Sequence, residues 1–257
     1  MVGMLEGRSI IVTGAAQGLG LAISRMIARE GGSVLMADIL DNDNEVVQQA
    51  VASVGDTSSY VRCDVTQASQ VRETVQHAVS RFGSLDGLVN NAGVGITGPI
   101  TEITEQQFDT TVAVNLKGVF LFLQQAIRQM LKQSNGGSIV NIGSAGSVVG
   151  TPELMLYAMS KHGVAGITRC AGVEYAEKGI RVNSVCPGPL WTDMMQTAAM
   201  EMYGTDDPAE IARKQHVPRG KLGMPDEAAE AVVWLLSERS KNCNGSMLMT
   251  DGGYTAW

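Results

Sequence analysis

A tyrosine and a lysine stand four residues apart in the stretch YAMSK, at Tyr157 and Lys161. If this stretch is helical, residues i and i+4 share a face, so both side chains can reach the same point. A phenol has a reference pKa of about 10 and exchanges protons poorly at neutral pH. A neighbouring ammonium favours the phenolate and lowers that pKa, which suits the phenol for acid–base catalysis. Such pairs also occur in packed helices, so the pair alone does not identify a catalytic site.

Two further polar residues favour the catalytic interpretation. Ser144 ends an apolar run that we predict to be the fifth strand, and it stands 13 residues before Tyr157. A hydroxyl at this sheet edge can orient an alcohol or carbonyl oxygen. Asn115 lies within a predicted long helix, where asparagine is only a moderate helix former, which indicates a local kink or a bound water.

Short apolar, β-branched runs alternate with amphipathic stretches along the chain. The seven predicted strands are residues 9–14, 33–38, 58–64, 85–91, 137–144, 180–188 and 246–253. The predicted helices are residues 19–30, 44–54, 68–81, 106–133, 154–177 and 225–237. Strands that are apolar almost throughout are typical of a parallel sheet covered by helices on both faces. We therefore predict one α/β domain over residues 1–257, built on a doubly wound, seven-stranded parallel sheet.

Residues 191–223 interrupt this alternation with polar, methionine-rich and weakly helical sequence. The segment follows the sixth predicted strand, at the carboxyl edge of the sheet. Ligands bind at that edge in doubly wound folds. We therefore expect a small substrate lid here rather than a second domain.

Three glycines, Gly14, Gly18 and Gly20, lie between the first predicted strand and the first predicted helix. Without Cβ atoms the chain can turn tightly, and the helix N-terminus offers free N–H groups to a pyrophosphate. Asp38 ends the second strand, where a carboxylate can accept hydrogen bonds from the adenosine ribose. The same charge repels a 2′-phosphate, and the neighbouring residues are not basic. The sequence therefore predicts NAD, in preference to NADP, as the cofactor.

These motifs together resemble the short-chain dehydrogenase/reductase family, over nearly the whole chain. Thr13–Gly20 resembles its Thr-Gly-x-x-x-Gly-x-Gly cofactor turn, and Asn115, Ser144, Tyr157 and Lys161 match its catalytic tetrad in order and spacing. The resemblance implies a Rossmann fold and an NAD-dependent oxidoreductase that interconverts a secondary alcohol and a ketone. It implies that Tyr157 is the general acid/base and that Ser144 positions the substrate oxygen. It also implies that Lys161 lowers the pKa of the tyrosine and binds ribose, while Asn115 anchors a water in a proton relay.

The resemblance extends to further cofactor contacts. Asp64 with Val65 is similar to the pair that contacts adenine, Asn90–Gly93 to the motif that steadies the sheet, and Pro187–Thr192 to the loop that meets the nicotinamide carboxamide. The cofactor-binding residues implied in this way are Gly14, Gln17, Gly18, Leu19, Gly20, Asp38, Ile39, Asp64, Val65, Asn91, Ala92, Gly93, Tyr157, Lys161, Pro187, Gly188, Leu190 and Thr192. Gly143 departs from the family pattern, which often has a serine at this position.

The predicted substrate pocket is lined by apolar side chains. The candidates are Val94, Met155, Trp191, Met194 and Met195. Methionine and tryptophan adapt to bulky or ring-shaped apolar ligands, and residues 192–202 contain no Lys or Arg that would pair with an anionic group. We therefore expect a neutral, apolar or cyclic alcohol or ketone. The alternative, that the methionines only pack the lid against the core, stays open.

Two other functions remain open. A 3-oxoacyl-(acyl-carrier-protein) reductase shares the fold and the tetrad, but usually takes NADPH and needs a basic patch for its acidic carrier. Asp38 and a sequence pI of about 5.0 disfavour this function. A non-catalytic dinucleotide-binding relative would have no need of the intact tetrad.

The composition disfavours several other classes of protein. A net charge of -7 over 257 residues gives no electrostatic attraction to nucleic acid or an anionic membrane. No apolar run approaches the roughly 18–20 residues needed to cross a bilayer, and the N-terminus lacks the basic-then-apolar order of a signal peptide. The four cysteines and three histidines show no metal-ligand spacing, so we expect no metal. We expect a cytoplasmic enzyme with a small-molecule substrate.

Several predicted elements suit burial between subunits. The helices at 106–133 and 154–177 are apolar on more than one side, and the tail GGYTAW at 252–257 is apolar too. The resemblance implies a homotetramer assembled through such elements.

Overall fold

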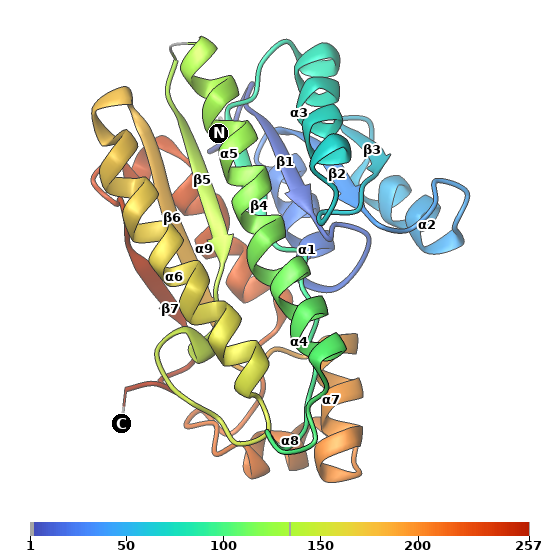
Figure 1. Ribbon diagram of the computed structural model, residues 1–257. Helices are drawn as coiled ribbons and strands as arrows, with labels where there is room; N and C mark the ends of the chain where they lie inside the picture. Colours follow the sequence, from blue (N-terminus) through green and yellow to red (C-terminus); the bar gives the residue numbers. More distant parts are fainter. Residues whose placement is uncertain (1–2, 134, 257) are drawn as a thin grey trace.

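The computed structural model describes residues 3–133 and 135–256. Its strands are β1 Ser9–Thr13, β2 Ser33–Asp38, β3 Ser58–Arg62, β4 Gly87–Asn90, β5 Gly137–Ile142, β6 Ile180–Pro187 and β7 Met247–Thr250. Within the described residues they form a seven-stranded sheet in the order β3-β2-β1-β4-β5-β6-β7, and each neighbouring pair is parallel (Figure 1). The order reverses between β1 and β4, and this switch point opens a crevice at the carboxyl ends of the strands.

Helices cover both faces of the sheet, which explains why the central strands are apolar throughout. The α-helices are α1 Gly18–Arg29, α2 Glu45–Val54, α3 Ala68–Phe82, α4 Glu105–Thr111, α5 Gly118–Gln133, α6 Met155–Tyr175, α7 Asp193–Tyr203, α8 Pro208–Lys214 and α9 Pro225–Leu236. The core on one face lies under α1 and α9, and the core on the other face lies under α3, α5 and α6. In Figure 1, α7 and α8 lie beyond the carboxyl ends of the strands.

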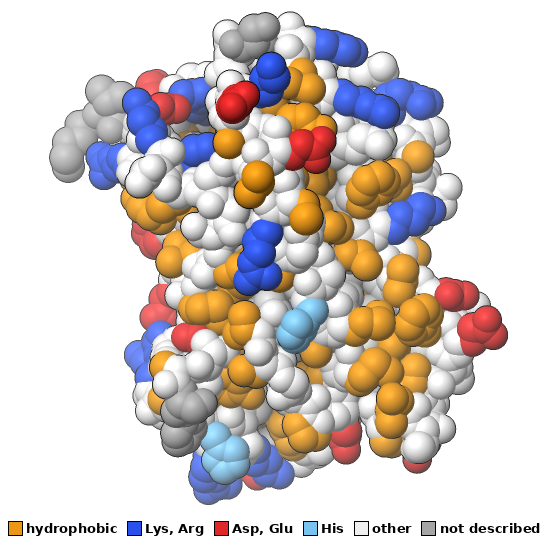
Figure 2. Space-filling view, turned by 60° about the vertical axis from the view of Figure 1, so that its left-hand side comes forward, with side chains coloured by type: hydrophobic (Ala, Val, Ile, Leu, Met, Phe, Trp, Pro, Cys, Tyr) orange, Lys and Arg blue, Asp and Glu red, His pale blue; other side chains and the backbone are white. Residues whose placement is uncertain are grey.

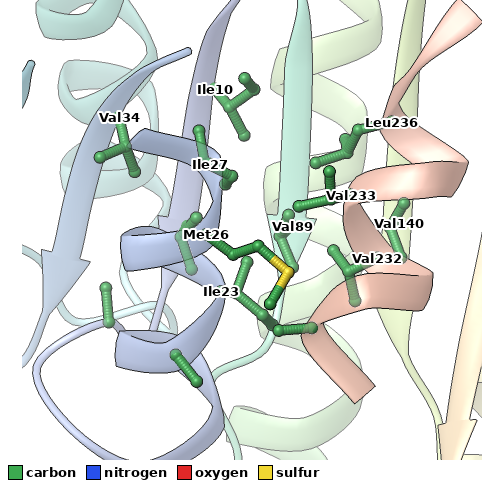
Figure 3. Close-up of a cluster of buried hydrophobic side chains, with 14 of the residues drawn as sticks. Ile10, Ile23, Met26, Ile27, Val34, Val89, Val140, Val232, Val233 and Leu236 are labelled. Atoms are coloured by element: carbon green, nitrogen blue, oxygen red, sulfur yellow. The ribbon is translucent and has the colours of Figure 1, made fainter. Parts of the chain in front are cut away.

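The packing of α1 against α9 shows how one of these cores is built. Ile23 and Met26 of α1 meet Val232 and Val233 of α9, above the buried side chain of Val89 in β4 (Figure 3). Burial of one such side chain contributes about 1.5–3 kcal/mol. This core fixes the start of α1 relative to the sheet, and with it the glycine turn that precedes the helix.

The structure confirms the predicted fold class, but several elements break or end at other residues than predicted. The predicted helix 106–133 is interrupted by a π-helical segment, Val112–Lys117, between α4 and α5. The predicted fifth strand ends at Ile142, so Ser144 lies just beyond the sheet. The weakly helical segment 191–223 contains two short helices, α7 and α8.

None of the described helices is both long and apolar enough to cross a membrane. Trp257, the end of the tail that we assigned to a subunit contact, lies outside the described residues.

Candidate active site

Tyr157 and Lys161 lie one turn apart near the start of α6. Lys161 is only 4% exposed, and its Nζ donates a hydrogen bond of 2.7 Å to the carbonyl of Ile142, the last residue of β5. The Nζ lies 5.4 Å from the centroid of the Tyr157 ring. A buried ammonium is therefore fixed beside the tyrosine by the end of the neighbouring strand.

Ser144 begins the short 3₁₀ helix Ala145–Ser147 that connects β5 to the loop before α6. Its Oγ accepts a hydrogen bond of 3.1 Å from Gly146 N, and no hydrogen bond among the described residues uses its O–H. A Cβ placed on Gly146 would lie 3.5 Å from Ser144 Oγ and 3.8 Å from Tyr157 Cδ1. The serine hydroxyl and the tyrosine ring therefore border the same small space.

Asn115 lies in the π-helical segment and is fully buried. Its Nδ2 donates to Val94 O at 2.9 Å and to Ser160 Oγ at 3.1 Å, and its Oδ1 accepts from Val94 N at 2.8 Å. Single-turn π segments occur frequently at functional sites. Here the asparagine joins the loop after β4 to α6, next to Tyr157.

The glycine turn is locked to the loop after β4. Thr13 Oγ1 accepts hydrogen bonds from the N–H groups of Asn91 and Ala92, both at 3.0 Å. Asn91 Nδ2 in turn donates to the carbonyls of Thr13 and Gly14. A Cβ on Gly14 would lie 2.9 Å from Ala92 Cα, so the two loops touch backbone to backbone. The Asn90–Gly93 motif thus holds the glycine turn in a fixed position relative to β4.

The turn leaves a cradle at the start of α1. Gly18 has a φ of +54°, and a Cβ there would meet nothing closer than Thr192 Cγ2 at 3.9 Å. Gln17, the N-cap of α1, makes no side-chain capping bond, so N–H groups of the first helical turn point to this space. Free helix N–H groups and an absent Cβ suit a pyrophosphate. The residues present therefore fit a dinucleotide that spans from Asp38 to Thr192.

Asp38 lies at the end of β2, next to the glycine turn. Its Oδ2 accepts a hydrogen bond from Ala16 N at 3.0 Å, and its Oδ1 accepts one from Ile39 N at 2.8 Å. The carboxylate is thus held in place by the turn itself, and Ile39 beside it is exposed.

Asp64 and Val65 lie after β3. Asp64 Oδ1 accepts hydrogen bonds from the N–H and the hydroxyl of Thr66. Burial acts to raise the pKa of Asp64, but the hydrogen bonds from Thr66 and Gln67, together with the charge of Arg62, leave the pKa below its usual value. Val65 packs against Gly118, where a Cβ would lie 2.8 Å from Val65 Cγ2.

The loop after β6 is held against the end of β7. Pro187 pairs with Thr250, and a Cβ on Gly188 would lie 2.9 Å from Asp251 Cα. Leu190 forms an isolated bridge with Gly223 and is buried.

The candidate substrate residues divide into two groups. Trp191 and Met195 pack against a small separate core built from α7, α8 and the following loop. Met194 lies on another side of α7, with its Cγ and Sδ 3.6 Å from where a Cβ on Gly95 would stand. Val94 is bonded to Asn115 as described, and Met155 is the first residue of α6.

The sequence did not indicate a role for Ser160, and it did not explain why residue 143 is a glycine. Ser160 joins Asn115 to α6, but a serine within a helix carries no signal of such a role. A Cβ on Gly143 would lie 2.7 Å from Cys186 Sγ and Ser184 Oγ and 2.9 Å from Ser147 Oγ. The departure from the family pattern therefore reflects crowding behind Ser144. Burial raises the pKa of the Cys186 thiol in this crowded site.

Among the described residues, no three His, Cys, Asp or Glu side chains are grouped so that they could hold a metal ion.

Comparison with known proteins gives the family. A family model described as Enoyl-(Acyl carrier protein) reductase matches residues 14–255. The chain is 39% identical, over 98% of its length and 98% of the relative's, to 2,5-dichloro-2,5-cyclohexadiene-1,4-diol dehydrogenase of Sphingobium indicum. It is 37% identical to a 3-oxoacyl-(acyl-carrier-protein) reductase of Thermotoga maritima, over 97% of this chain and 98% of that one.

The crystal structure of levodione reductase matches with a TM-score of 0.91 and 33% identity, covering 98% of this chain and 99% of that one. The chain therefore belongs to the short-chain dehydrogenase/reductase family, and it is an oxidoreductase that interconverts a secondary alcohol and a ketone.

Proposed function

We propose that this oxidoreductase uses NAD(H) in preference to NADP(H). The observation that carries this proposal is the carboxylate of Asp38, which the backbone N–H of Ala16 holds at the end of β2. A fixed carboxylate there accepts hydrogen bonds from ribose hydroxyls and repels a 2′-phosphate. Residues 1–257 form one NAD-binding catalytic domain in this proposal, with residues 191–223 as a lid.

Residues from the end of β2 to the loop after β6 would hold the dinucleotide. Its proposed contacts are the residues implied by the sequence, from Gly14–Gly20 through Asp38, Ile39, Asp64, Val65 and Asn91–Gly93 to Pro187–Thr192. Bound there, the nicotinamide supplies the hydride chemistry, while the protein supplies position and electrostatics. The N–H groups at the start of α1 would hold the pyrophosphate.

Tyr157 is the proposed general acid/base. In reduction its phenol gives a proton to the carbonyl oxygen of the substrate, and in oxidation the phenolate takes the proton of the alcohol. Lys161 is its proposed partner, because the buried Lys161 side chain stands 5.4 Å from the ring centroid and can stabilise negative charge on the phenolic oxygen. Two N–H bonds of Nζ remain for a ribose hydroxyl after the bond to Ile142.

Ser144 and Asn115 complete the proposed site. The free O–H of Ser144 donates to the substrate oxygen and fixes it beside the phenol. Both N–H bonds of the Asn115 amide are used, by Val94 and Ser160, so a relay water would be held through an oxygen atom of this residue. In this proposal Asn115 has two roles: it positions Val94 and Ser160 next to the site, and it binds the relay water.

The proposed substrate is a neutral, apolar or cyclic alcohol or ketone. The proposed contacts with the substrate are Val94, Met155 and Met194. Trp191 and Met195 would support the pocket indirectly, because they pack on the small core of the lid. The relative in Sphingobium indicum is named for a ring-shaped diol, which supports a cyclic substrate.

A second candidate is a 3-oxoacyl-(acyl-carrier-protein) reductase. A relative with that name matches almost the whole chain, which favours it. The position of Asp38 and the acidic pI of about 5.0 stand against it. We place the enzyme in the cytoplasm and propose that it acts as a homotetramer.

The test is a kinetic screen. Purified protein is mixed with NAD or NADP and a panel of secondary alcohols, and with NADH or NADPH and the matching ketones, while the near-ultraviolet absorbance of the reduced cofactor is followed. We expect turnover of apolar or cyclic substrates with NAD(H). Tight NADH binding without turnover of any substrate would contradict the catalytic proposal and favour a non-catalytic dinucleotide binder.

A further inference from the structure

A hydrogen bond joins α7 to the loop after β4 at the proposed substrate pocket. Thr97 Oγ1 donates to Glu201 Oε2 at 2.8 Å, although the two residues are 104 positions apart in the chain. Glu201 lies two turns beyond Met194, so both residues share one side of α7. Met194 itself approaches Gly95 in the same loop. One face of α7 therefore lies along residues 95–97.

The other face of α7 packs within the lid itself. Met195, Ala199 and Tyr203, spaced at i, i+4 and i+8, pack on the small core of the lid. Ala199 is the buried residue of this helix, so little apolar packing holds α7 against the rest of the molecule. The bond between Thr97 and Glu201 is thus a principal contact between the lid and the body on this side.

The same loop also forms hydrogen bonds with two other parts of the molecule. Val94 is bonded to Asn115, and Gly98 N donates to the carbonyl of Glu153 at 2.9 Å, in the segment just before α6. Glu153 has a left-handed φ of +63°, a conformation that is strained for a non-glycine residue. The loop 94–98 therefore connects α7, the π segment and the segment just before α6.

We propose that the Thr97–Glu201 hydrogen bond is a clasp that closes the outer end of the substrate pocket and selects compact, untethered substrates. A thioester on a carrier arm must leave its arm in an open channel during the reaction. The hydrogen bond joins α7 to the loop, and Glu201 and the exposed Glu153 add negative charge that opposes an acidic carrier or a phosphate-bearing arm. This inference rests on the proposed function and names the substrate shape for the same site.

The first test uses Thr97→Val, which keeps the side-chain shape and removes the donor, with Thr97→Ser as the matched control that keeps it. The initial rate with NADH is measured for a methyl-substituted cyclohexanone, for acetoacetyl-N-acetylcysteamine and for acetoacetyl-CoA. We expect the wild type to prefer the ring ketone. In Thr97→Val, the ratio of kcat/KM between the ring ketone and either thioester should fall about three- to tenfold, as for loss of one hydrogen bond. Thr97→Ser should keep the wild-type ratio.

A second variant separates closure from charge. Glu201→Gln keeps an acceptor oxygen for Thr97 but removes the negative charge. It should leave the ratio for the uncharged N-acetylcysteamine thioester unchanged and improve only acetoacetyl-CoA. If the wild type reduces the thioesters as efficiently as the ring ketone, or if Thr97→Val leaves the ratio unchanged, the clasp proposal is wrong while the oxidoreductase function stands.

A readout independent of turnover completes the test. Amide hydrogen exchange of residues 193–203 should be faster in NADH-loaded Thr97→Val than in the wild type, and unchanged in Thr97→Ser. Equal exchange in all three proteins would overturn the clasp. Failure of every ketone to react with NADH, in contrast, would overturn the proposed function.

Discussion

At the scale of single residues, the proposed preference for NAD(H) depends on Asp38, a side chain that the backbone holds in place. Ala16 of the glycine turn and Ile39, the residue after β2, each donate one N–H to its carboxylate. Because the turn itself binds the dinucleotide in our proposal, the position of the charge relative to the ribose is fixed before the cofactor arrives. Preorganisation of this kind lowers the cost of binding.

We predict that Asp38→Asn shifts the preference toward NADP. The variant keeps one acceptor oxygen but loses the charge that repels a 2′-phosphate, so the ratio of kcat/KM for NAD over NADP should fall about tenfold or more, equivalent to roughly 1.4 kcal/mol. Asp43→Asn, which removes an exposed carboxylate in the next loop, is the control. An unchanged ratio in Asp38→Asn would refute the role of this carboxylate.

Gly143 illustrates a residue fixed by steric crowding alone. We predict that Gly143→Ala destabilises the protein by about 1–3 kcal/mol, because the new Cβ would meet Cys186 and Ser184 at 2.7 Å. A loss of that size lowers the Tm by about 2–4 °C per kcal/mol in a protein of this size. Gly150→Ala, where a Cβ meets nothing within 4 Å, is the control. Equal thermal denaturation curves for both variants would show that the site has room.

At the scale of elements, the π segment explains why an asparagine occurs in a long helix. One buried side chain satisfies both backbone groups of Val94 and also bonds Ser160. Helix α4, helix α5, the loop after β4 and helix α6 are thereby held in one arrangement. A buried polar group that lost these partners would incur the cost of desolvation.

A double-mutant cycle tests this link. Asn115→Ala and Ser160→Ala should each destabilise the protein by about 1–3 kcal/mol, and the double variant should lose less than the sum by about 1 kcal/mol. Urea denaturation at fixed protein concentration measures the free energy of unfolding, since assembly would make it depend on concentration. Strictly additive losses would mean that the two residues act independently.

The same segment marks what the sequence could predict. The strands, the glycine turn and the pairing of Tyr157 with Lys161 follow from local patterns, because each depends on residues close together in the chain. The π segment depends on Val94 and Ser160, which are distant in sequence, so an uninterrupted helix over 106–133 was the natural expectation. The orientation of α7 is equally non-local, so the sequence did not distinguish Met195, which packs on the small core of the lid, from Met194, which faces Gly95.

At the scale of the whole molecule, apolar side chains remain exposed on neighbouring helices. Phe108 of α4, Phe120 and Leu131 of α5 and Val173 of α6 are exposed, and Val173 is 80% exposed. Helices α5 and α6 lie on the same face of the sheet (Figure 1). Figure 2, in which the side with α6 and β7 comes forward, shows hydrophobic side chains spread over much of the surface. Contiguous exposed apolar surface is typical of an interface between proteins, and the exposed side chains of α5 and α6 are the candidates for such a surface here.

We predict a tetramer of 27.2 kDa chains in solution, assembled in part through this helical face. Val173→Glu should dissociate it into smaller species, because a charge buried without a partner is costly. Val46→Glu changes an exposed valine on α2, outside this face, and should leave the assembly intact. Analytical ultracentrifugation reports the mass, and a wild-type species near that of a single chain would contradict the proposal.

Turnover by Tyr157→Phe is the decisive measurement for the proposed mechanism. Only the phenolic oxygen is removed, so the fold and NADH binding should be kept while kcat falls about 10²–10⁴-fold, the usual contribution of general acid–base catalysis. Tyr175→Phe, at the far end of α6, serves as the control and should keep the wild-type rate. If Tyr157→Phe folds, binds NADH and turns over at close to the wild-type rate, Tyr157 is not the acid/base and the proposed mechanism is wrong.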